Sequence, residues 1–299
     1  MRIIQSFWTK PFLDRKGTGE GNRWNGGWPH RKLNYFSWAL SCLLLRSQYK
    51  DVELVTDERG KDILIGQLQL PYSKTTTVLN MLANRNGALW ALGKIYAYGL
   101  QKEPFLHVDN DVFIERPFSR RIVTAGLAAQ NVQLRTPHYS DTFRKVTALF
   151  QHIPGYLAAL SGQSIVPCCN AGILGGNDIP FFQAYLKEVH AFLDNNAAAI
   201  DGSLHTMNAG YFNVIYEQVL FYALAQSLNK KITYLFPKAE DIPAEVGFFQ
   251  AAGKNSHFVH CFGNYKKFPA VYLFMEDMLK QRFPKYYDRI ENLIATFEL

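Results

Sequence analysis

Two carboxylates stand one residue apart at Asp109 and Asp111, directly after the apolar run at residues 104–108. Carboxylate oxygens are hard ligands, and a pair at this spacing can hold Mg²⁺ or Mn²⁺ against the oxygens of a diphosphate. Two aspartates at this spacing, without other motifs, also arise by chance in a solvated acidic turn. Here it follows a strand-like run, and open α/β folds bind ligands beyond the carboxyl ends of their strands. The pattern therefore predicts a metal site at a sheet edge.

Two further polar residues lie where they could serve the same crevice. Asp57 ends the strand-like run at residues 52–57, where it can contact a ribose or base, or can equally cap a helix. Lys94 lies in the helix-like segment before the acidic pair. From there it can reach a phosphate or a sugar hydroxyl, and an ordinary surface lysine is the alternative. Both are expected nucleotide-binding residues.

Alternating strand-like and helix-like segments must position these residues, and such alternation is typical of an α/β layered fold. Strands are expected near residues 2–8, 52–57, 104–108, 122–129, 171–176 and 232–236. Helices are expected near residues 31–48, 88–100, 140–150, 155–160, 179–195, 213–228 and 270–299, the last interrupted at Pro284. The sequence contains no internal repeat or low-complexity linker. We therefore expect one domain, with a catalytic core at 1–269 and a helical extension at 270–299.

The composition is that of a folded protein with a basic balance. Of the 299 residues, 48% are hydrophobic and 19% charged, which argues against disorder. The net charge of +7 favours anionic partners. The basic residues are scattered and no nucleic-acid-binding motif accompanies them, so we expect no nucleic acid as a partner. Four cysteines without CxxC spacing indicate neither a zinc site nor a disulfide framework.

The apolar stretches fall short of the roughly 20 residues that a membrane-spanning helix needs. The N-terminus passes straight into a strand-like run without the apolar core of a signal peptide, so we expect a cytoplasmic protein. A basic and aromatic segment at residues 280–287, together with the net charge, suggests peripheral binding to anionic lipids at the inner face of the membrane.

The acidic pair resembles the metal-binding DxD motif of nucleotide-sugar glycosyltransferases with the GT-A fold. Two later segments are similar to motifs of glycosyltransferase family 8: Asn-Ala-Gly-Ile-Leu at residues 170–174, and the spacing His-x-x-Gly-x-x-Lys from His260 to Lys266. The resemblance implies a mixed, mostly parallel sheet flanked by helices. It also implies metal-dependent transfer of a sugar from a nucleotide-diphosphate sugar, specifically a UDP-sugar, to a glycan or lipid-linked acceptor, with retention of configuration.

The same resemblance implies roles for the residues that match these motifs. Asp109, Asp111 and His260 would hold Mn²⁺ or Mg²⁺, and Asp109 would also face the nucleotide. Lys266 would neutralise the leaving diphosphate. Gly263 would let the backbone approach the phosphates.

The reacting sugar would face a second group of residues. Glu217 and Gln218 resemble an acidic–Gln pair of the family, although members usually carry Asp at the first position, and an exposed polar helix face is the alternative. Asn170 belongs to the Asn-Ala-Gly motif, but residues 208–210 repeat that run, so Asn208 is a second candidate. Candidates for stacking on an acceptor sugar are the aromatic residues Trp24, Trp28, Tyr139 and Tyr211.

Other functions remain open at the level of sequence. An inverting reaction could use Glu217 or Asp178 as its base. A phosphohydrolase with a DxD nucleophile needs Thr or Val two residues after the second Asp, where this chain has Phe113. A catalytically inactive nucleotide- or sugar-binding protein is the main alternative, because Lys267 and Phe268 replace the family's usual Pro-Trp.

Overall fold

The computed structural model of the chain describes residues 1–13, 24–133, 137–237 and 257–296. Its centre is a seven-stranded sheet in the order β3-β2-β1-β4-β7-β6-β8. The strands are β1 (Arg2–Phe7), β2 (Val52–Thr56), β3 (Lys74–Thr76), β4 (Phe105–Val108), β6 (Leu127–Gln133), β7 (Cys168–Gly176) and β8 (Ile232–Tyr234). A separate two-stranded ribbon pairs β5 (Val112–Ile114) with β9 (Phe258–His260) in antiparallel fashion.

Four of the strand pairs in the large sheet are parallel and two are antiparallel. The parallel pairs are β1–β2, β1–β4, β2–β3 and β6–β8. Strand β7 runs antiparallel to both β4 and β6. Every residue of β4 is buried, as expected for a strand covered by helices on both faces. The predicted fold class, a mixed and mostly parallel sheet flanked by helices, is confirmed.

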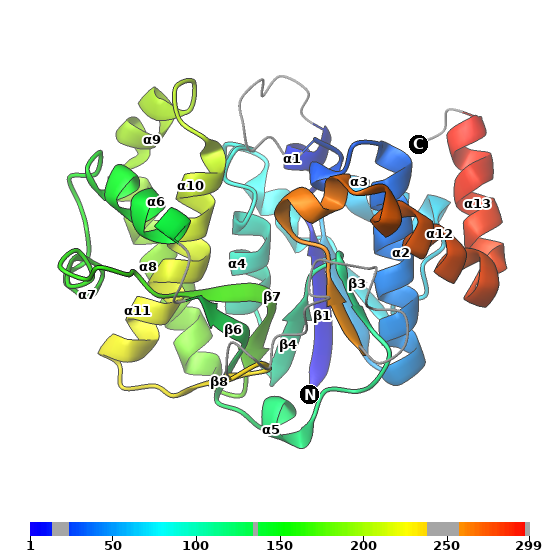
Figure 1. Cartoon of the computed structure of the whole chain (residues 1–299), viewed down its shortest axis with the longest axis horizontal. Helices are drawn as coiled ribbons and strands as arrows, with labels where there is room; N and C mark the ends of the chain where they lie inside the picture. The colour runs from blue at the N-terminus through cyan, green and yellow to red at the C-terminus, as the bar shows by residue number, and fades with distance from the viewer. Residues whose placement is uncertain (14–23, 134–136, 238–256, 297–299) are drawn as a thin grey trace.

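The helices form layers on either side of this sheet, as Figure 1 shows. One group comprises α2 (Arg31–Gln48), α12 (Pro269–Arg282) and α13 (Pro284–Ala295), which pack on one another. The other group comprises α4 (Leu92–Gly99), α6 (Pro137–Thr147), α7 (Gly155–Ala158), α8 (Ile179–Asn195), α9 (Ala197–Ser203), α10 (Ala209–Val214) and α11 (Leu220–Ser227). Shorter turns are α1 (Thr9–Leu13), η1 (Trp24–Gly27), α3 (Glu58–Lys61), η2 (Asp62–Gln67), η3 (Val78–Leu82), α5 (Arg120–Val123), η4 (Ile215–Val219) and η6 (Gly263–Lys267).

The expected elements differ from the observed ones where side chains from distant segments intervene. The helix expected at residues 88–100 begins only at Leu92, because the amide of Asn213 binds the carbonyl of Ala88 and the N–H of Ala91. The helix expected at residues 213–228 is interrupted by the π-helical turn η4.

The strand expected at residues 122–129 was wrong in its first half. Residues 120–123 form the helical turn α5, in which Ile122 is buried, and the strand β6 begins at Leu127. A run of β-branched residues favours a strand, but here the N–H groups of Val123 and Thr124 bond to the carbonyls of Ser119 and Arg120 and close a helical turn. No helix within the described part of the chain has both the length and the hydropathy to cross a membrane.

Candidate active site

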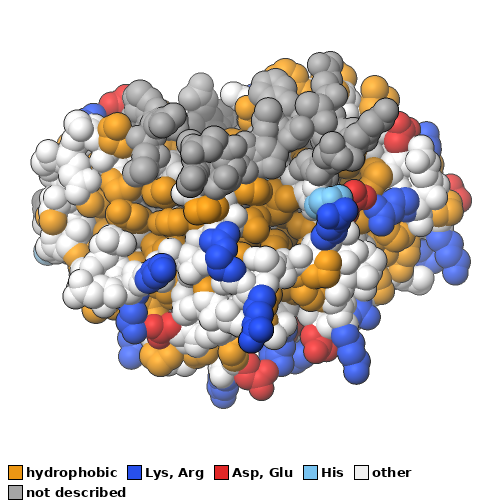
Figure 2. Space-filling model, turned by 60° about the horizontal axis from the view of Figure 1, so that its bottom comes forward, with side chains coloured by type: hydrophobic (Ala, Val, Ile, Leu, Met, Phe, Trp, Pro, Cys, Tyr) orange, Lys and Arg blue, Asp and Glu red, His pale blue; other side chains and the backbone are white. Residues whose placement is uncertain are grey.

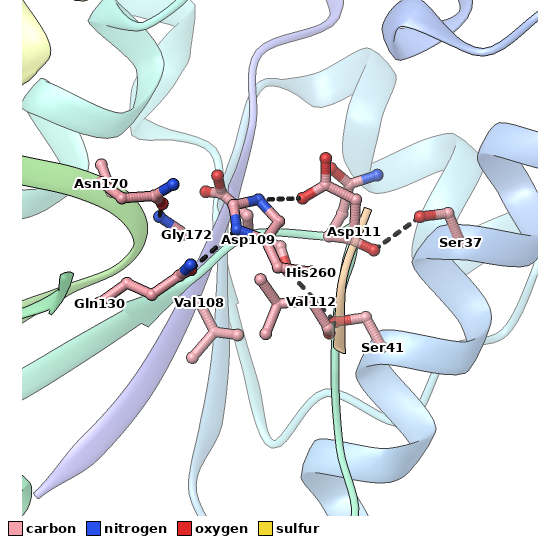
Figure 3. A network of polar contacts seen from close by, with 12 residues as sticks. Ser37, Ser41, Val108, Asp109, Asp111, Val112, Gln130, Asn170, Gly172 and His260 are labelled. Carbon is pink, nitrogen blue, oxygen red and sulfur yellow. Dashed lines mark hydrogen bonds and ion pairs between the residues drawn. The ribbon is translucent and has the colours of Figure 1, made fainter. Parts of the chain in front are cut away.

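The three predicted metal ligands come together at the carboxyl end of β4. One ligand atom each from Asp109, Asp111 and His260 lies within 4.8 Å of the other two (Figure 3). Asp109 follows β4, and Asp111 leads directly into β5. His260 is the last residue of β9, where it pairs with Val112 of β5. The two-stranded ribbon therefore brings a histidine from late in the chain to the acidic turn.

The burial and the chemistry of these side chains fit a divalent cation. Asp111 is 6% exposed, and its Oδ1 has no hydrogen-bond partner among the described residues. A buried carboxylate oxygen without a donor is costly, and a cation would satisfy it. Two carboxylates and one imidazole form a donor set that suits Mn²⁺ and also accommodates Mg²⁺.

Helix α2 holds the acidic turn through its backbone. Ser37 Oγ donates to the carbonyl of Asn110 at 2.7 Å, and Ser41 Oγ donates to the carbonyl of Val112 at 2.7 Å (Figure 3). Both serines are fully buried in an otherwise apolar stretch of helix. Gln5 of β1 in turn donates to Ser41 Oγ at 3.0 Å. These serines were not predicted from the sequence, although two polar residues four apart on an apolar helix are a visible signal.

Two lysines neutralise the acidic groups of the site. Lys94 Nζ lies 2.9 Å from Asp109 Oδ1 and also forms an ion pair with Glu217. Although burial favours the neutral amine, these two carboxylates raise the pKa of Lys94. Lys266 Nζ lies 2.7 Å from Asp111 Oδ2 and donates to the carbonyl of Gly26 at 2.9 Å.

The two aspartates respond to this environment in opposite ways. Burial raises the pKa of Asp109 to about 6, even though Lys94 acts in the other direction. Burial would also raise the pKa of Asp111, but the ammonium of Lys266 holds it well below its usual range. Asp111 is therefore the more acidic member of the pair.

Glu217 and Gln218 reach the site because the helix that contains them widens into the π-helical turn η4. Such turns are frequent at functional sites. The hydroxyl of Tyr185 donates to the carbonyls of Tyr216 and Glu217, at 2.9 and 2.7 Å, which anchors the turn from α8. The side-chain oxygen of Gln218 is buried without a partner among the described residues. It is thus an acceptor left open to a ligand.

One cavity of about 580 Å³ contains nearly all the predicted site residues. Its lining includes Lys94, Asp109, Asp111, Asn170, Glu217, Gln218, His260, Gly263 and Lys266. The volume is in the range of pockets that bind small molecules and cofactors. The charged side chains that line it are three carboxylates and two lysines, which gives a formal charge of −1.

Asp57 does not line this cavity. Its carboxylate accepts hydrogen bonds from the N–H of Gly60 at 2.7 Å and from the N–H and hydroxyl of Thr9, both at 2.8 Å. Asp57 therefore caps α3, the alternative that the sequence had left open, and ties it to the start of α1. Asp178 also lies outside the lining, where it caps α8 and pairs with Lys230 at 2.7 Å.

Both Asn-Ala-Gly runs lie at the cavity. Asn170 accepts a hydrogen bond from the N–H of Gly172 at 2.9 Å, and Asn208 accepts one from the N–H of Gly210 at 2.8 Å. The second run caps α10. The two motifs thus form the same local turn on opposite elements, so the sequence alone could not rank them.

Aromatic residues form part of the wall near α10 and α6. Tyr139 and Tyr211, two of the predicted stacking residues, line the cavity. Trp90 and His138 line it as well and were not predicted from the sequence. Trp28 is buried, with Lys266 Nζ 5.4 Å from its ring centre, and the side chain of Trp24 is outside the described ones.

The basic and aromatic segment at residues 280–287 is largely engaged within the fold. Lys280 pairs with Glu276 at 2.7 Å, and Arg282 pairs with Glu115 at 2.5 Å. Tyr286 and Tyr287 are partly buried against the core around α2. On the face in Figure 2, Lys and Arg side chains are scattered, some of them beside Asp or Glu side chains.

Comparisons with known proteins give one family and several structures. The model of the family of unknown function DUF6734 matches residues 1–293. No curated protein matches the chain. GlyE, a glycosyltransferase of Streptococcus pneumoniae TIGR4, is 8% identical, with coverage of 99% of this chain and 63% of that one, at a TM-score of 0.47.

Two further structures are similar at lower scores. Mouse xyloside xylosyltransferase 1, in its apo form, is 10% identical, with coverage of 78% of this chain and 84% of that one, at a TM-score of 0.37. The galactosyltransferase LgtC, in complex with donor and acceptor sugar analogues, is 11% identical, with coverage of 72% and 70%, at a TM-score of 0.37.

Proposed function

The chain belongs to the family of unknown function DUF6734, and we propose that it is a metal-dependent glycosyltransferase that uses a nucleotide-diphosphate sugar, specifically a UDP-sugar. The observation that supports this most directly is the cluster of Asp109, Asp111 and His260 in a cavity whose other charges are placed for a diphosphate. A pocket with a formal charge of −1 repels a nucleotide diphosphate. A divalent cation reverses that sign, so we expect donor binding to require the metal.

In this proposal Asp109, Asp111 and His260 hold Mn²⁺ or Mg²⁺. The bound cation would stabilise the negative charge that develops on the departing diphosphate. Lys266 now forms an ion pair with Asp111. A phosphate oxygen of the donor would replace that carboxylate as the partner of the ammonium, which would then add to the same stabilisation. Gly263 adopts φ +56°, and the space around a Cβ there is open, so the backbone at η6 can approach the phosphates.

The sugar would lie toward α4 and η4. Lys94 and Glu217 form an ion pair at that wall, and the oxygen of Gln218 is free to accept a sugar hydroxyl. Asn170 borders the same space. We propose retention of configuration. This is supported by the two acids considered as the base of an inverting reaction, because Asp178 lies outside the cavity lining and Glu217 is engaged by Lys94.

The acceptor in this proposal is a glycan or a lipid-linked glycan. The aromatic wall that includes Trp90 and Tyr211 supports a sugar acceptor, because flat apolar rings pack well against the C–H faces of sugars. Peripheral binding to anionic lipids remains part of the proposal for a lipid-linked acceptor, and it is tested by co-sedimentation with anionic vesicles at low salt.

The first test is a calorimetric titration of UDP in the presence and absence of Mn²⁺. The informative variant is Asp109→Asn, because Lys94 keeps Glu217 as a partner there. Asp141→Asn removes an exposed carboxylate outside the cavity and serves as the control. We expect Mn²⁺-dependent binding in wild type and Asp141→Asn, and at least tenfold weaker binding in Asp109→Asn.

A screen of nucleotide sugars then separates enzyme from binding protein. Release of UDP from one donor supports the transferase. Metal-dependent UDP binding without consumption of any donor identifies the inactive binding protein instead. Absence of binding with UDP, GDP and other nucleotides overturns the proposal.

A further inference from the structure

The pairing of β6 with β7 is irregular beside the candidate metal site. Ala129 pairs with Leu174, and the next pair is Asn131 with Asn170. Three residues of β7, at 171–173, therefore stand opposite the single residue Gln130. Such bulges bend a strand locally and re-aim side chains, and they are frequent next to active sites.

This irregularity places Gln130 against the back of His260. Gln130 is 1% exposed, and its Oε1 lies 2.8 Å from His260 Nδ1 (Figure 3). The amide nitrogen of Gln130 donates to Asn131 Oδ1 at 3.2 Å. Because the amide nitrogen has this partner, the amide oxygen is the atom that faces the imidazole, and it can only accept.

The hydrogen bond fixes which imidazole nitrogen bears the proton. His260 Nδ1 must donate to Gln130, so in the neutral imidazole it is Nε2 that retains its lone pair. That Nε2 lies 3.5 Å from Asp111 Oδ1, the buried oxygen without a hydrogen-bond partner. With a neutral imidazole, two acceptors thus face each other, which is the arrangement that a cation stabilises.

Gly172 makes the pair possible. A Cβ at this position would lie 2.3 Å from Gln130 Oε1 and 2.4 Å from His260 Nδ1. Neither atom could keep its place, because both residues are buried. The glycine at the centre of the bulge therefore leaves room for the contact between Gln130 and His260.

We propose that Gln130 is a positioning residue, which holds His260 in the Nδ1–H form with Nε2 turned toward Asp111. The inference rests on the proposed function only in taking the cluster as a metal site, and it makes no use of the donor or the acceptor. Partners that orient metal-binding histidines in this way set the tautomer and the basicity of the ligand.

The first measurement uses the metal-free, full-length wild-type protein. Long-range ¹H–¹⁵N correlation spectra of its histidines, with His260 assigned by its loss in His260→Asn, report the tautomer directly. We expect the Nδ1–H form. An Nε2–H form overturns the proposal without any variant at position 130.

The second measurement is the affinity for Mn²⁺ in the absence of nucleotide, with electron paramagnetic resonance as the readout. Gln130→Met keeps the length of the side chain and removes the acceptor, and Gln130→Glu keeps the acceptor. We expect about 10- to 100-fold weaker Mn²⁺ binding in Gln130→Met and near wild-type affinity in Gln130→Glu. A purely packing role would leave Gln130→Met unchanged, and that result overturns the proposal.

These readouts are independent of sugar transfer. A wild-type protein with the expected tautomer and variant pattern that consumes no nucleotide sugar contradicts the proposed transferase and supports the role of Gln130. A wild-type protein that binds neither Mn²⁺ nor Mg²⁺ overturns this inference together with the metal site.

Discussion

Lys266 Nζ lies 2.7 Å from Asp111 Oδ2, and both side chains are buried. The ammonium group occupies one oxygen of a candidate metal ligand. A cation at this site and the lysine therefore compete for the charge of the same carboxylate. A phosphate that accepts the lysine would relieve that competition, so metal and nucleotide should each strengthen the binding of the other.

Lys266→Met tests this competition. Removal of the ammonium leaves Asp111 free for the metal, so we expect Mn²⁺ to bind at least about tenfold more tightly without nucleotide, which is ~1.4 kcal/mol. The gain in Mn²⁺ affinity on addition of UDP should shrink in parallel. Calorimetric Mn²⁺ titrations with and without UDP measure both effects. Unchanged Mn²⁺ affinity in the variant would show that the lysine does not compete.

Asp111→Asn should destabilise the fold as well as the metal site. The substitution leaves the buried ammonium of Lys266 without its carboxylate, and breaking one side of a buried pair costs about 3–5 kcal/mol. The double variant with Lys266→Met removes the stranded charge and should recover much of that loss. Urea unfolding of the three variants and the wild type measures the difference. Equal stability of Asp111→Asn and wild type would contradict the prediction.

Gly172→Ala should disturb the site where the same change at Gly126 does not. The added Cβ at Gly172 meets Gln130 and His260 at 2.3–2.5 Å, whereas a Cβ at Gly126 meets nothing within 4 Å. We expect a loss of roughly 1–3 kcal/mol in unfolding free energy for Gly172→Ala, together with weaker Mn²⁺ binding. Thermal unfolding and Mn²⁺ titration compare the two variants. Similar behaviour of both would rule out the packing argument.

The two serines of α2 that bond to the acidic turn should contribute to stability and to metal binding. Ser37→Ala and Ser41→Ala each remove a hydrogen bond to the acidic turn, and each should cost about 1 kcal/mol and weaken Mn²⁺ binding. Ser47 donates only to a carbonyl of its own helix, so Ser47→Ala is the matched control. Metal affinity that falls equally in all three variants would argue against a specific hold on the turn.

A stability effect of pH is expected from His190, which does not line the candidate active site. Burial lowers the pKa of His190 below 6.5, and the nearby Arg85, which donates to its Nδ1 at 3.2 Å, lowers it further. The unfolded chain therefore binds the proton more tightly. The contribution of His190 to stability is complete above pH 6.5 and is lost as the pH falls from there through the folded-state pKa.

The pH dependence of the thermal midpoint, compared between wild type and His190→Gln, measures this contribution. We expect a shallower decline below pH 6.5 in the variant. Parallel curves would exclude the imidazole as a source of acid sensitivity.

Local sequence patterns predicted what depends on one segment at a time. The apolar stripe of residues 31–48 and the Pro-initiated helix at residues 179–195 matched the observed α2 and α8 to the residue. The three residues of the candidate metal cluster were also predicted, because short motifs named them by resemblance, and the structure brings them together.

What the sequence could not predict arises from contacts between distant segments. The π-helical turn that carries Glu217 is anchored by Tyr185, and the bulge opposite Gln130 depends on the pairing of β6 with β7. The role of Asp57 was decided by Thr9, the first residue of α1. None of these relationships has a periodicity or spacing along the chain.

The ribbon of β5 and β9 has a consequence for stability. It joins the acidic turn after β4 to a strand more than a hundred residues later, so a cation held by Asp109, Asp111 and His260 would cross-link the chain across a long loop. A cross-link of this kind restricts the unfolded chain and favours the folded one. Mn²⁺ should therefore stabilise the folded protein against unfolding, and the free energy of unfolding should rise with the concentration of the ion.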